Sequence, residues 1–290
     1  MDVSIRAKLL SSLLRFYPKP TGEKREEMLA DALQEGEKAT QAPKIIQTRY
    51  KDYASGRVFF ANEKDIAQNI IFYIHGGAYI LDLNVTHWQF ISKLIDKTDS
   101  LIVAPAYHVA PFGTYKEAFD LILPVYREYC EKYPENKIIV MGDSAGGGLS
   151  LALAEFCKKE GIRQPDELVL ISPWVDVIMD NPEIRNYEPN DPSLSVEDLS
   201  VCAKSWAGSL DLHDWKISPI YGDLTGIRNV TAFTGTCEIF YPDITKFFHM
   251  LEESPTNELI VGQEMCHIYP LFPIPEAKEA IEIIAGKILR

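Results

Sequence analysis

The sequence lacks any cysteine arrangement that would predict a disulfide framework or a zinc site. Its five cysteines are odd in number, lie far apart and include no C-x-x-C pair or cysteine–histidine cluster. Isolated thiols of this kind are typical of a reducing compartment. We therefore expect reduced cysteines and a cytoplasmic protein.

Long apolar runs are also missing. No stretch is long enough to span a bilayer. The N-terminal segment MDVSIRAKLLSSLLRFYPKP has a broken apolar pattern and no small-residue cleavage site, so it predicts an amphipathic helix and not a signal peptide. Stable membrane insertion is not expected.

Positive charge is scarce. The chain has 29 Lys and Arg residues against 42 Asp and Glu residues, a formal net charge of -13. Nucleic acids and anionic membrane surfaces are polyanions that would repel such a chain, so neither is an expected partner. A neutral or cationic small molecule fits better. Nothing in the sequence sets the oligomeric state, and a homodimer stays open beside a monomer.

The elements that are present predict an α/β fold. With 290 residues and a hydrophobic content of 46%, the chain can bury a large core. From about residue 44 onward, short apolar runs alternate with helical patterns, which is typical of a mostly parallel sheet flanked by helices. Residues 45–61 predict an antiparallel hairpin leading into that sheet. The candidate buried strands are 69–75, 100–107, 137–142, 167–173, 230–236 and 258–263.

Two segments interrupt this alternation. Residues 1–42 are charged and helical, and residues 176–219 are rich in proline and separate the fourth and fifth parallel strands. Ligands of open α/β sheets bind at the carboxyl ends of the strands. We expect the two segments to form a helical cap there, over a catalytic core made of residues 43–175 and 220–290.

The most specific local motif is Gly142-Asp143-Ser144-Ala145-Gly146, which matches G-x-S-x-G between an apolar strand and an amphipathic helix. A side chain at either flanking glycine would clash in so sharp a turn. The serine is expected in strained backbone geometry that exposes its hydroxyl. The competing interpretation is a glycine-rich turn that only packs closely or binds phosphate. The strand and helix around the motif favour Ser144 as a nucleophile.

A second motif, His75-Gly76-Gly77-Ala78, ends the first parallel strand. A serine that attacks a carbonyl generates an oxyanion, which needs preorganised amide donors. Small residues let the backbone approach the substrate closely. We expect Gly77, Ala78 and Ala145 to donate to the oxyanion and Gly76 to shape the turn. His75 is expected to hold the loop rather than to act as a base.

A serine nucleophile also needs a base and an acid that orients the base. His267 directly follows the last apolar strand and fits the chain order serine, acid, histidine. Glu238 is the first acidic residue beyond the preceding strand and is the expected acid. Asp243 is the alternative, although capping of the next helix would also explain it.

Together, HGGA, YHVAP (107–111), GDSAGG and EMCHIYPLFPIPEA resemble the hormone-sensitive-lipase-like family of α/β hydrolases, over essentially the whole chain. The resemblance implies a carboxylesterase for short to medium acyl esters under a helical cap. It places the nucleophile at Ser144, the acid at Glu238, the base at His267 and the oxyanion loop at Gly76 to Ala78.

Three departures from the family pattern stand out. The acid position usually carries aspartate where this chain has Glu238. Glycine is commoner than Ala78 at the end of the oxyanion loop, and alanine is tolerated there if its backbone angles are ordinary. The usual acidic and proline-rich continuation after YHVAP is replaced by PFGTY.

The predicted reaction is therefore serine-dependent ester hydrolysis through an acyl-enzyme. It implies no metal and no organic cofactor. An amidase, deacetylase or peptidase with the same triad is an alternative, since amide and ester hydrolysis share the tetrahedral intermediate. A third interpretation is a catalytically inactive small-molecule receptor on the same fold, for which loss of the histidine would be expected.

Overall fold

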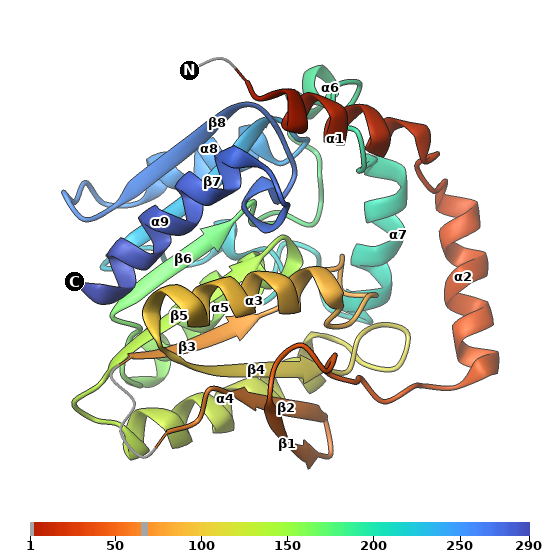
Figure 1. The fold of residues 1–290 in the computed structure, drawn as a ribbon. Helices are drawn as coiled ribbons and strands as arrows, with labels where there is room; N and C mark the ends of the chain where they lie inside the picture. Colours follow the sequence, from red (N-terminus) through yellow and green to blue (C-terminus); the bar gives the residue numbers. More distant parts are fainter. Residues whose placement is uncertain (1–2, 65–68) are drawn as a thin grey trace.

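The computed structural model describes residues 3–64 and 69–290 and has a mostly parallel sheet between two layers of helices (Figure 1). Residues 1–2 of the expected cap and 65–68 of the expected core lie outside the described residues. The sheet order is β1-β2-β4-β3-β5-β6-β7-β8. Its strands are β1 (Thr48–Tyr53), β2 (Gly56–Ala61), β3 (Asn69–Ile74), β4 (Leu101–Tyr107), β5 (Lys137–Asp143), β6 (Glu167–Ile171), β7 (Val230–Cys237) and β8 (Glu258–Cys266).

Strand direction follows the prediction from sequence. β1 and β2 form an antiparallel hairpin, and β2 is also antiparallel to β4, whereas the strands from β4 through β3 to β8 pair in parallel. The apolar, β-branched runs of β3 and β5 are buried because helices cover both faces of the sheet. The predicted α/β fold is confirmed. The predicted strand ends differ by a few residues, since β6 ends at Ile171 and β8 continues to Cys266.

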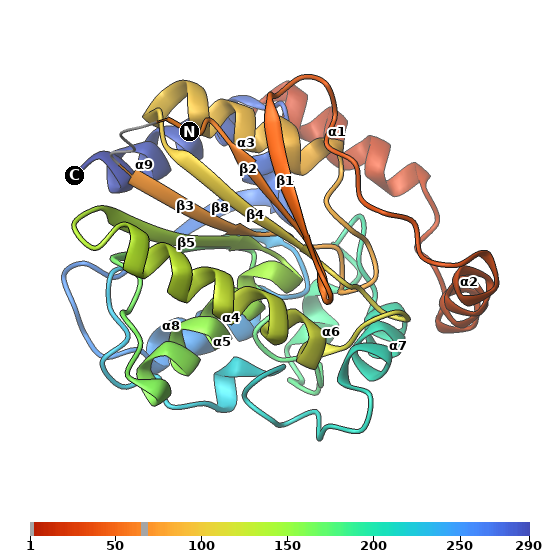
Figure 2. The same cartoon turned by 90° about the horizontal axis from the view of Figure 1, so that it is seen from below.

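Helices cover both faces of the sheet, as Figure 2 shows. On one face, α3 and α9 pack over a core that includes Trp88, Phe90 and Ile281; on the other, α4, α5 and α8 pack over a core that includes Tyr126, Leu149 and Phe247. The helices on these faces are α3 (Val85–Thr98), α4 (Tyr115–Lys132), α5 (Ala145–Glu160), α8 (Tyr241–Met250) and α9 (Pro275–Leu289).

The two interrupting segments fold as helices near the carboxyl ends of the parallel strands (Figure 1). They contain α1 (Ile5–Phe16), α2 (Gly22–Glu35), α6 (Ile184–Tyr187) and α7 (Val196–Ala207), and two 3-10 turns, η1 (Pro219–Tyr221) and η2 (Tyr269–Leu271), lie further along the chain. Arg25 of α2 donates from Nε to Asp198 Oδ1 of α7 at 2.6 Å and from Nη2 to Oδ2 at 3.1 Å. This buried ion pair joins segments that are 173 residues apart.

Within the described residues, no helix is long and apolar enough to cross a membrane.

Candidate active site

The candidate site lies where five neighbouring strands end. β3 runs beside β5 with Ile74 opposite Gly142, and β5 runs beside β6 with Asp143 opposite Ile171. β7 and β8 continue the row, with Cys237 opposite Cys266. The loops that follow these strands therefore meet at one edge of the sheet, although they come from distant parts of the sequence.

Ser144 occupies the sharp turn between β5 and α5. Its backbone angles are φ 54° and ψ -123°, so the predicted strain at this serine is confirmed. A Cβ at Gly142 would lie 2.3 Å from the carbonyl oxygen of Gly146, and a Cβ at Gly146 would lie 2.1 Å from that of Ile74. Only glycine fits at these two positions, which explains the motif.

The three predicted triad residues meet in a hydrogen-bonded chain. His267 Nε2 lies 2.9 Å from Ser144 Oγ, and His267 Nδ1 lies 2.6 Å from Glu238 Oε2. A carboxylate can only accept, so Nδ1 carries the proton and Nε2 is left to accept from the serine hydroxyl. His267 is 6% exposed and Glu238 is fully buried. This arrangement can remove the serine proton and stabilise the imidazolium that forms.

The other predicted acid, Asp243, does not reach the histidine. It lies in the first turn of α8, and its Oδ1 accepts a hydrogen bond from Asn181 Nδ2 at 2.7 Å. Burial raises the pKa of Asp243 to about 6. This contact joins α8 to the segment that follows β6. His267 is contacted by Glu238 instead.

The carboxylate of Glu238 is held by three donors at its second oxygen. Oε1 accepts from Thr234 Oγ1 at 2.6 Å, from the Gly235 amide at 2.7 Å and from Ser172 Oγ at 3.0 Å. The arrangement fixes Oε2 toward His267.

Ser172 is a residue that the sequence did not single out. Besides donating to Glu238, its Oγ accepts from the amide of Ile268, at 3.0 Å. Its φ of 46° is a further strained angle at this edge of the sheet. Ser172 thus links the acid to the loop that carries the histidine. The signal in the sequence that could have identified Ser172 is its position directly after the buried strand β6.

The oxyanion loop follows β3. Gly77 has φ 114°, which glycine adopts without strain. Ala78 has φ 53°, in the left-handed region. The sequence predicted that alanine is tolerated at this position if its backbone angles are ordinary. The angle of Ala78 is not ordinary, so the backbone is strained there. In residues 3–64 and 69–290, no acceptor contacts the amides of Gly77 and Ala78.

Ala145 is the first residue of α5 and, in the described part of the chain, its amide is likewise without an acceptor outside the helix. The first amides of a helix have no partner within it and carry its positive dipole end. Free amides in the loop after β3 and at the start of α5 suit an oxyanion.

Asp143 connects the oxyanion loop to the nucleophile turn. Its Oδ1 accepts from Tyr73 Oη at 2.5 Å and from the Gly76 amide at 3.2 Å, and His87 Nε2 lies 3.4 Å from Oδ2. The pKa of Asp143 lies below its ordinary value: burial acts to raise it, but the charge of His87 and these hydrogen bonds outweigh burial. In the sequence motif, Asp143 is only the variable position before the serine.

His75 fills a structural place in this loop, as its sequence context suggested. Its ring stacks on Tyr107 with centroids 4.3 Å apart, and its Nδ1 lies 2.8 Å from the carbonyl oxygen of Gly76. Burial lowers the pKa of His75 to about 3, so the imidazole is neutral. The neutral ring supports the loop without adding charge beside the oxyanion position.

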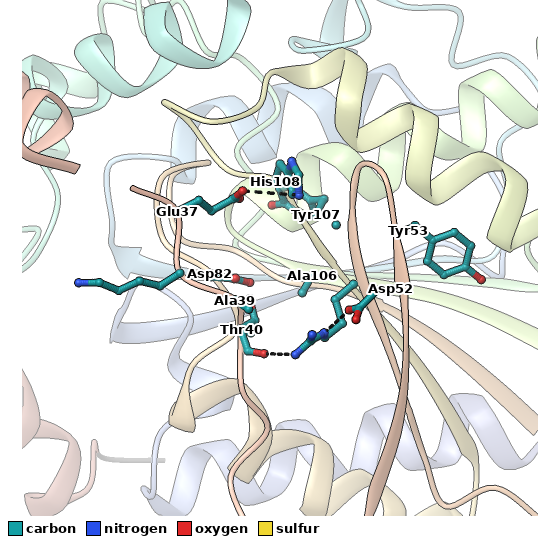
Figure 3. Close-up of a pocket in the computed structure, with 12 residues that line it drawn as sticks. Glu37, Ala39, Thr40, Asp52, Tyr53, Asp82, Ala106, Tyr107 and His108 are labelled. Carbon is teal, nitrogen blue, oxygen red and sulfur yellow. Dashed lines mark hydrogen bonds and ion pairs between the residues drawn. The ribbon is translucent and has the colours of Figure 1, made fainter. Parts of the chain in front are cut away.

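A separate polar cavity of about 300 Å³ lies beside the hairpin of β1 and β2 (Figure 3). Asp82 and Tyr107 line it, and Figure 3 shows His108 beside Glu37. Arg57, which also lines the cavity, forms an ion pair with Asp52. None of the three predicted triad residues lines this cavity, which is therefore separate from the candidate site.

Comparison with known proteins agrees with this geometry. A family model described as the alpha/beta hydrolase fold matches residues 71–271. The chain belongs to the α/β-hydrolase family. The matched range spans the oxyanion loop, the nucleophile turn and both partners of the triad.

This hydrolase is 31% identical over 226 residues to an esterase of Acinetobacter venetianus, covering 76% of this chain and 74% of the relative. It is 28% identical over 224 residues to an acetyl-hydrolase of Streptomyces hygroscopicus, covering 76% and 75%. A hormone-sensitive lipase from a metagenome library has the same fold, with a TM-score of 0.83, 24% identity and 99% of each chain covered. The family expected from the motifs is confirmed.

Proposed function

We propose that this hydrolase is a serine carboxylesterase that cleaves short to medium acyl esters through an acyl-enzyme on Ser144. The observation that carries the proposal is the hydrogen-bonded chain from Ser144 Oγ through His267 to the buried carboxylate of Glu238. The esterase and acetyl-hydrolase relatives support the same reaction class.

In the proposed reaction, His267 Nε2 takes the proton of Ser144 as the hydroxyl oxygen attacks the ester carbonyl. The amides of Gly77, Ala78 and Ala145 hold the oxyanion. His267 then passes its proton to the departing alcohol, and water repeats the sequence on the acyl-enzyme to release the acid. The reaction needs a neutral imidazole, so we expect activity to fall when His267 is protonated at acid pH.

Aromatic side chains around the nucleophile favour the short end of the acyl range. Seven buried rings follow one another from the triad histidine to the oxyanion loop, with neighbouring centroids 4.3 to 5.7 Å apart: His267, Phe240, Trp174, Tyr79, Trp206, Tyr107 and His75. Such rigid rings, which extend from His267, would limit the room for a long acyl chain beside Ser144. We expect acetyl and butyryl esters to be the best substrates.

The test is a panel of nitrophenyl esters from acetate to decanoate, assayed with wild type, Ser144→Ala and Ser12→Ala. Ser12 is an exposed serine of α1 and serves as the matched control. Wild type and Ser12→Ala should share one profile that declines with chain length, and Ser144→Ala should lose activity by a factor on the order of 10³ or more. Equal rates for Ser144→Ala and wild type would contradict the proposal.

An amidase or deacetylase would use the same three residues. Matched ester and anilide substrates with one acyl group separate the two, and we expect the ester to be the better substrate in kcat/KM. A non-catalytic receptor would bind such esters without releasing nitrophenol. The presence of His267 in contact with Ser144 supports the enzyme.

Domain division, location and assembly complete the proposal. Residues 1–42 and 176–219 form the cap over a core of residues 43–175 and 220–290, which the contact between α2 and α7 supports. All five cysteines are unpaired, which suits a cytoplasmic protein. Sedimentation of the full chain distinguishes a monomer from a homodimer.

A further inference from the structure

The first helix shows an apolar face to solvent. Ile5, Leu9, Leu13 and Phe16 are 77%, 57%, 59% and 84% exposed, respectively. Their spacing of four, four and three residues places them on one side of α1. Single exposed apolar residues are ordinary, but a continuous stripe of four marks an interaction surface.

The stripe is presented by a helix that is fixed in place. On its inner side Ala7 is buried and Leu10 packs against the core that α9 also covers. The Ser4 amide and hydroxyl both donate to Glu276 of α9, at 2.7 and 2.9 Å. At the other end, Arg15 Nη2 donates to the carbonyl oxygen of Asn190 at 2.7 Å. These contacts hold both ends of α1 in place, so its apolar face stays exposed to solvent.

An apolar groove adjoins α1 and has a basic rim. Its floor contains Phe272, Ile274, Ala277 and Ile281, from the loop after η2 and from α9. Its volume is about 460 Å³. The rim carries one basic residue of α1, two of α3 and one of α9, namely Arg6, Lys93, Lys97 and Lys278. Glu282 is the acidic residue among those that line the groove, and it pairs with Lys97.

The first helix and the groove beside it are rich in basic residues, although the protein as a whole is acidic. Residues 3–20 carry four basic and no acidic side chains, whereas the whole chain has a formal net charge of -13. In the part of the chain that the structure describes, no carboxylate forms an ion pair with Arg6, Lys93 or Lys278. Charge and apolar surface thus coincide on one side, where α1, α3 and α9 lie together (Figure 2).

We infer that the surface formed by the α1 stripe and the basic-rimmed groove binds reversibly to an anionic lipid surface. An apolar helix face flanked by Lys and Arg side chains binds in the plane of a membrane interface, and its affinity depends on anionic lipid. A second copy of the chain fits less well, because paired α1 helices would bring their own cations together.

The formal net charge of -13 predicted that an anionic membrane surface would repel the chain. That expectation holds only if the negative charge is spread evenly, and the basic residues of α1, α3 and α9 around the groove are an exception. At physiological ionic strength the Debye length is about 8 Å, so charges farther away than this are largely screened. The charge of one face, rather than the net charge, therefore decides whether that face approaches a polyanion. The binding is peripheral and needs no membrane-spanning element.

The test is flotation of the full chain with vesicles. We expect binding to vesicles of phosphatidylcholine and phosphatidylglycerol in a 3:1 ratio, and binding at least tenfold weaker to phosphatidylcholine alone. Raising the salt to about 0.5 M should weaken binding to the anionic vesicles, because the Debye length falls to a few ångströms.

Matched variants separate this surface from the rest of the molecule. Leu13→Ser should weaken vesicle binding severalfold, whereas Leu33→Ser on α2, at the same 59% exposure, should not. Lys278→Gln should weaken binding about fivefold, and Lys246→Gln on α8 should have no effect. All four should keep the wild-type rate on nitrophenyl acetate, because none lies in the catalytic machinery.

Failure of the wild-type chain to float with anionic vesicles would overturn the inference, as would equal binding by Leu13→Ser and Leu33→Ser. If Leu13→Ser instead converts a dimer to a monomer in sedimentation and vesicle binding is absent, the stripe is a contact between two copies. Vesicle binding does not require ester hydrolysis, so this result and the test of the proposed function are independent.

Discussion

At the scale of single residues, geometry that the sequence does not contain favours Glu238 over Asp243 as the acid. Both follow β7 within a few positions. Only Glu238 contacts His267, at 2.6 Å, because Asp243 has already entered α8. Glutamate is one methylene longer than the usual aspartate, and its second oxygen is fixed by three donors. The longer side chain is therefore as well oriented as a shorter one would be.

Glu238→Gln should lower kcat on a short nitrophenyl ester by a factor on the order of 10³ to 10⁴. The amide cannot hold the histidine in the tautomer that accepts the serine proton. Asp243→Asn is the matched control, since it makes the same chemical change at the competing carboxylate. A larger loss in Asp243→Asn than in Glu238→Gln would reverse the assignment.

Ser172→Ala should lower kcat about 10- to 100-fold with little change in KM. It removes one hydrogen bond to a buried carboxylate and one from the backbone amide of Ile268, each of which positions a triad partner. Ser218→Ala is the control, because Ser218 is equally buried and accepts from the Val177 amide away from the triad. A loss of thermal stability without a change in kcat would show that Ser172 is only structural.

The sequence pointed to the proposed catalytic residues but not to the residues that contact and position them. Ser144 could be predicted because its turn motif is a local pattern in the sequence. His267 could be predicted because it fits the order serine, acid, histidine along the chain. Ser172 and Asp143 depend on the register between β5 and β6, where Asp143 lies opposite Ile171. Register follows from packing across the whole sheet, so no pattern along the chain reveals it.

At the scale of secondary-structure elements, the proposed cap contains a buried charge pair. Arg25 and Asp198 are 9% and 6% exposed in their side chains and join α2 to α7. The strands were predictable because each buried run is continuous in sequence. The pairing of α2 with α7 was not, because one arginine and one aspartate among many charged residues carry no signal of their contact.

Arg25→Met should destabilise the packing of α2 on α7 by about 3 to 5 kcal/mol, because it leaves Asp198 buried without a partner. Arg25→Met combined with Asp198→Leu should recover most of that loss. Lys38→Met is the control, since it breaks an ion pair with Glu35 that is exposed and contributes little. Hydrogen exchange of residues 22–35 and 196–207 measures the effect, and an unchanged exchange rate in Arg25→Met would contradict it.

At the scale of the whole molecule, a buried carboxyl couples stability to pH. Glu155 of α5 is buried against Gly222, where an added Cβ would lie 1.4 Å from its Oε2. Among the described residues, its Oε1 has no hydrogen-bond partner. Burial raises the pKa of Glu155 from 4.5 to about 8. Because the folded-state pKa is the higher one, its contribution to stability is complete below pH 4.5 and is lost as pH rises through 8.

Wild type should therefore lose stability relative to Glu155→Gln as pH rises from 5 to 9, by an amount on the order of a few kcal/mol. Urea unfolding of both proteins at several pH values measures the difference. Glu160→Gln, at the exposed end of the same helix, should follow wild type throughout. Parallel pH curves for wild type and Glu155→Gln would rule out the buried carboxyl as the cause.

The edge of the sheet that carries the candidate site is formed by strands that are synthesised at very different times. Ser144 and its proposed base His267 are 123 residues apart in sequence, and Glu238 follows a third strand, β7. A chain is synthesised from its N-terminus. Through that interval the nascent polypeptide holds a nucleophile without its base, so under the proposed function it stays chemically inert until β8 joins the sheet.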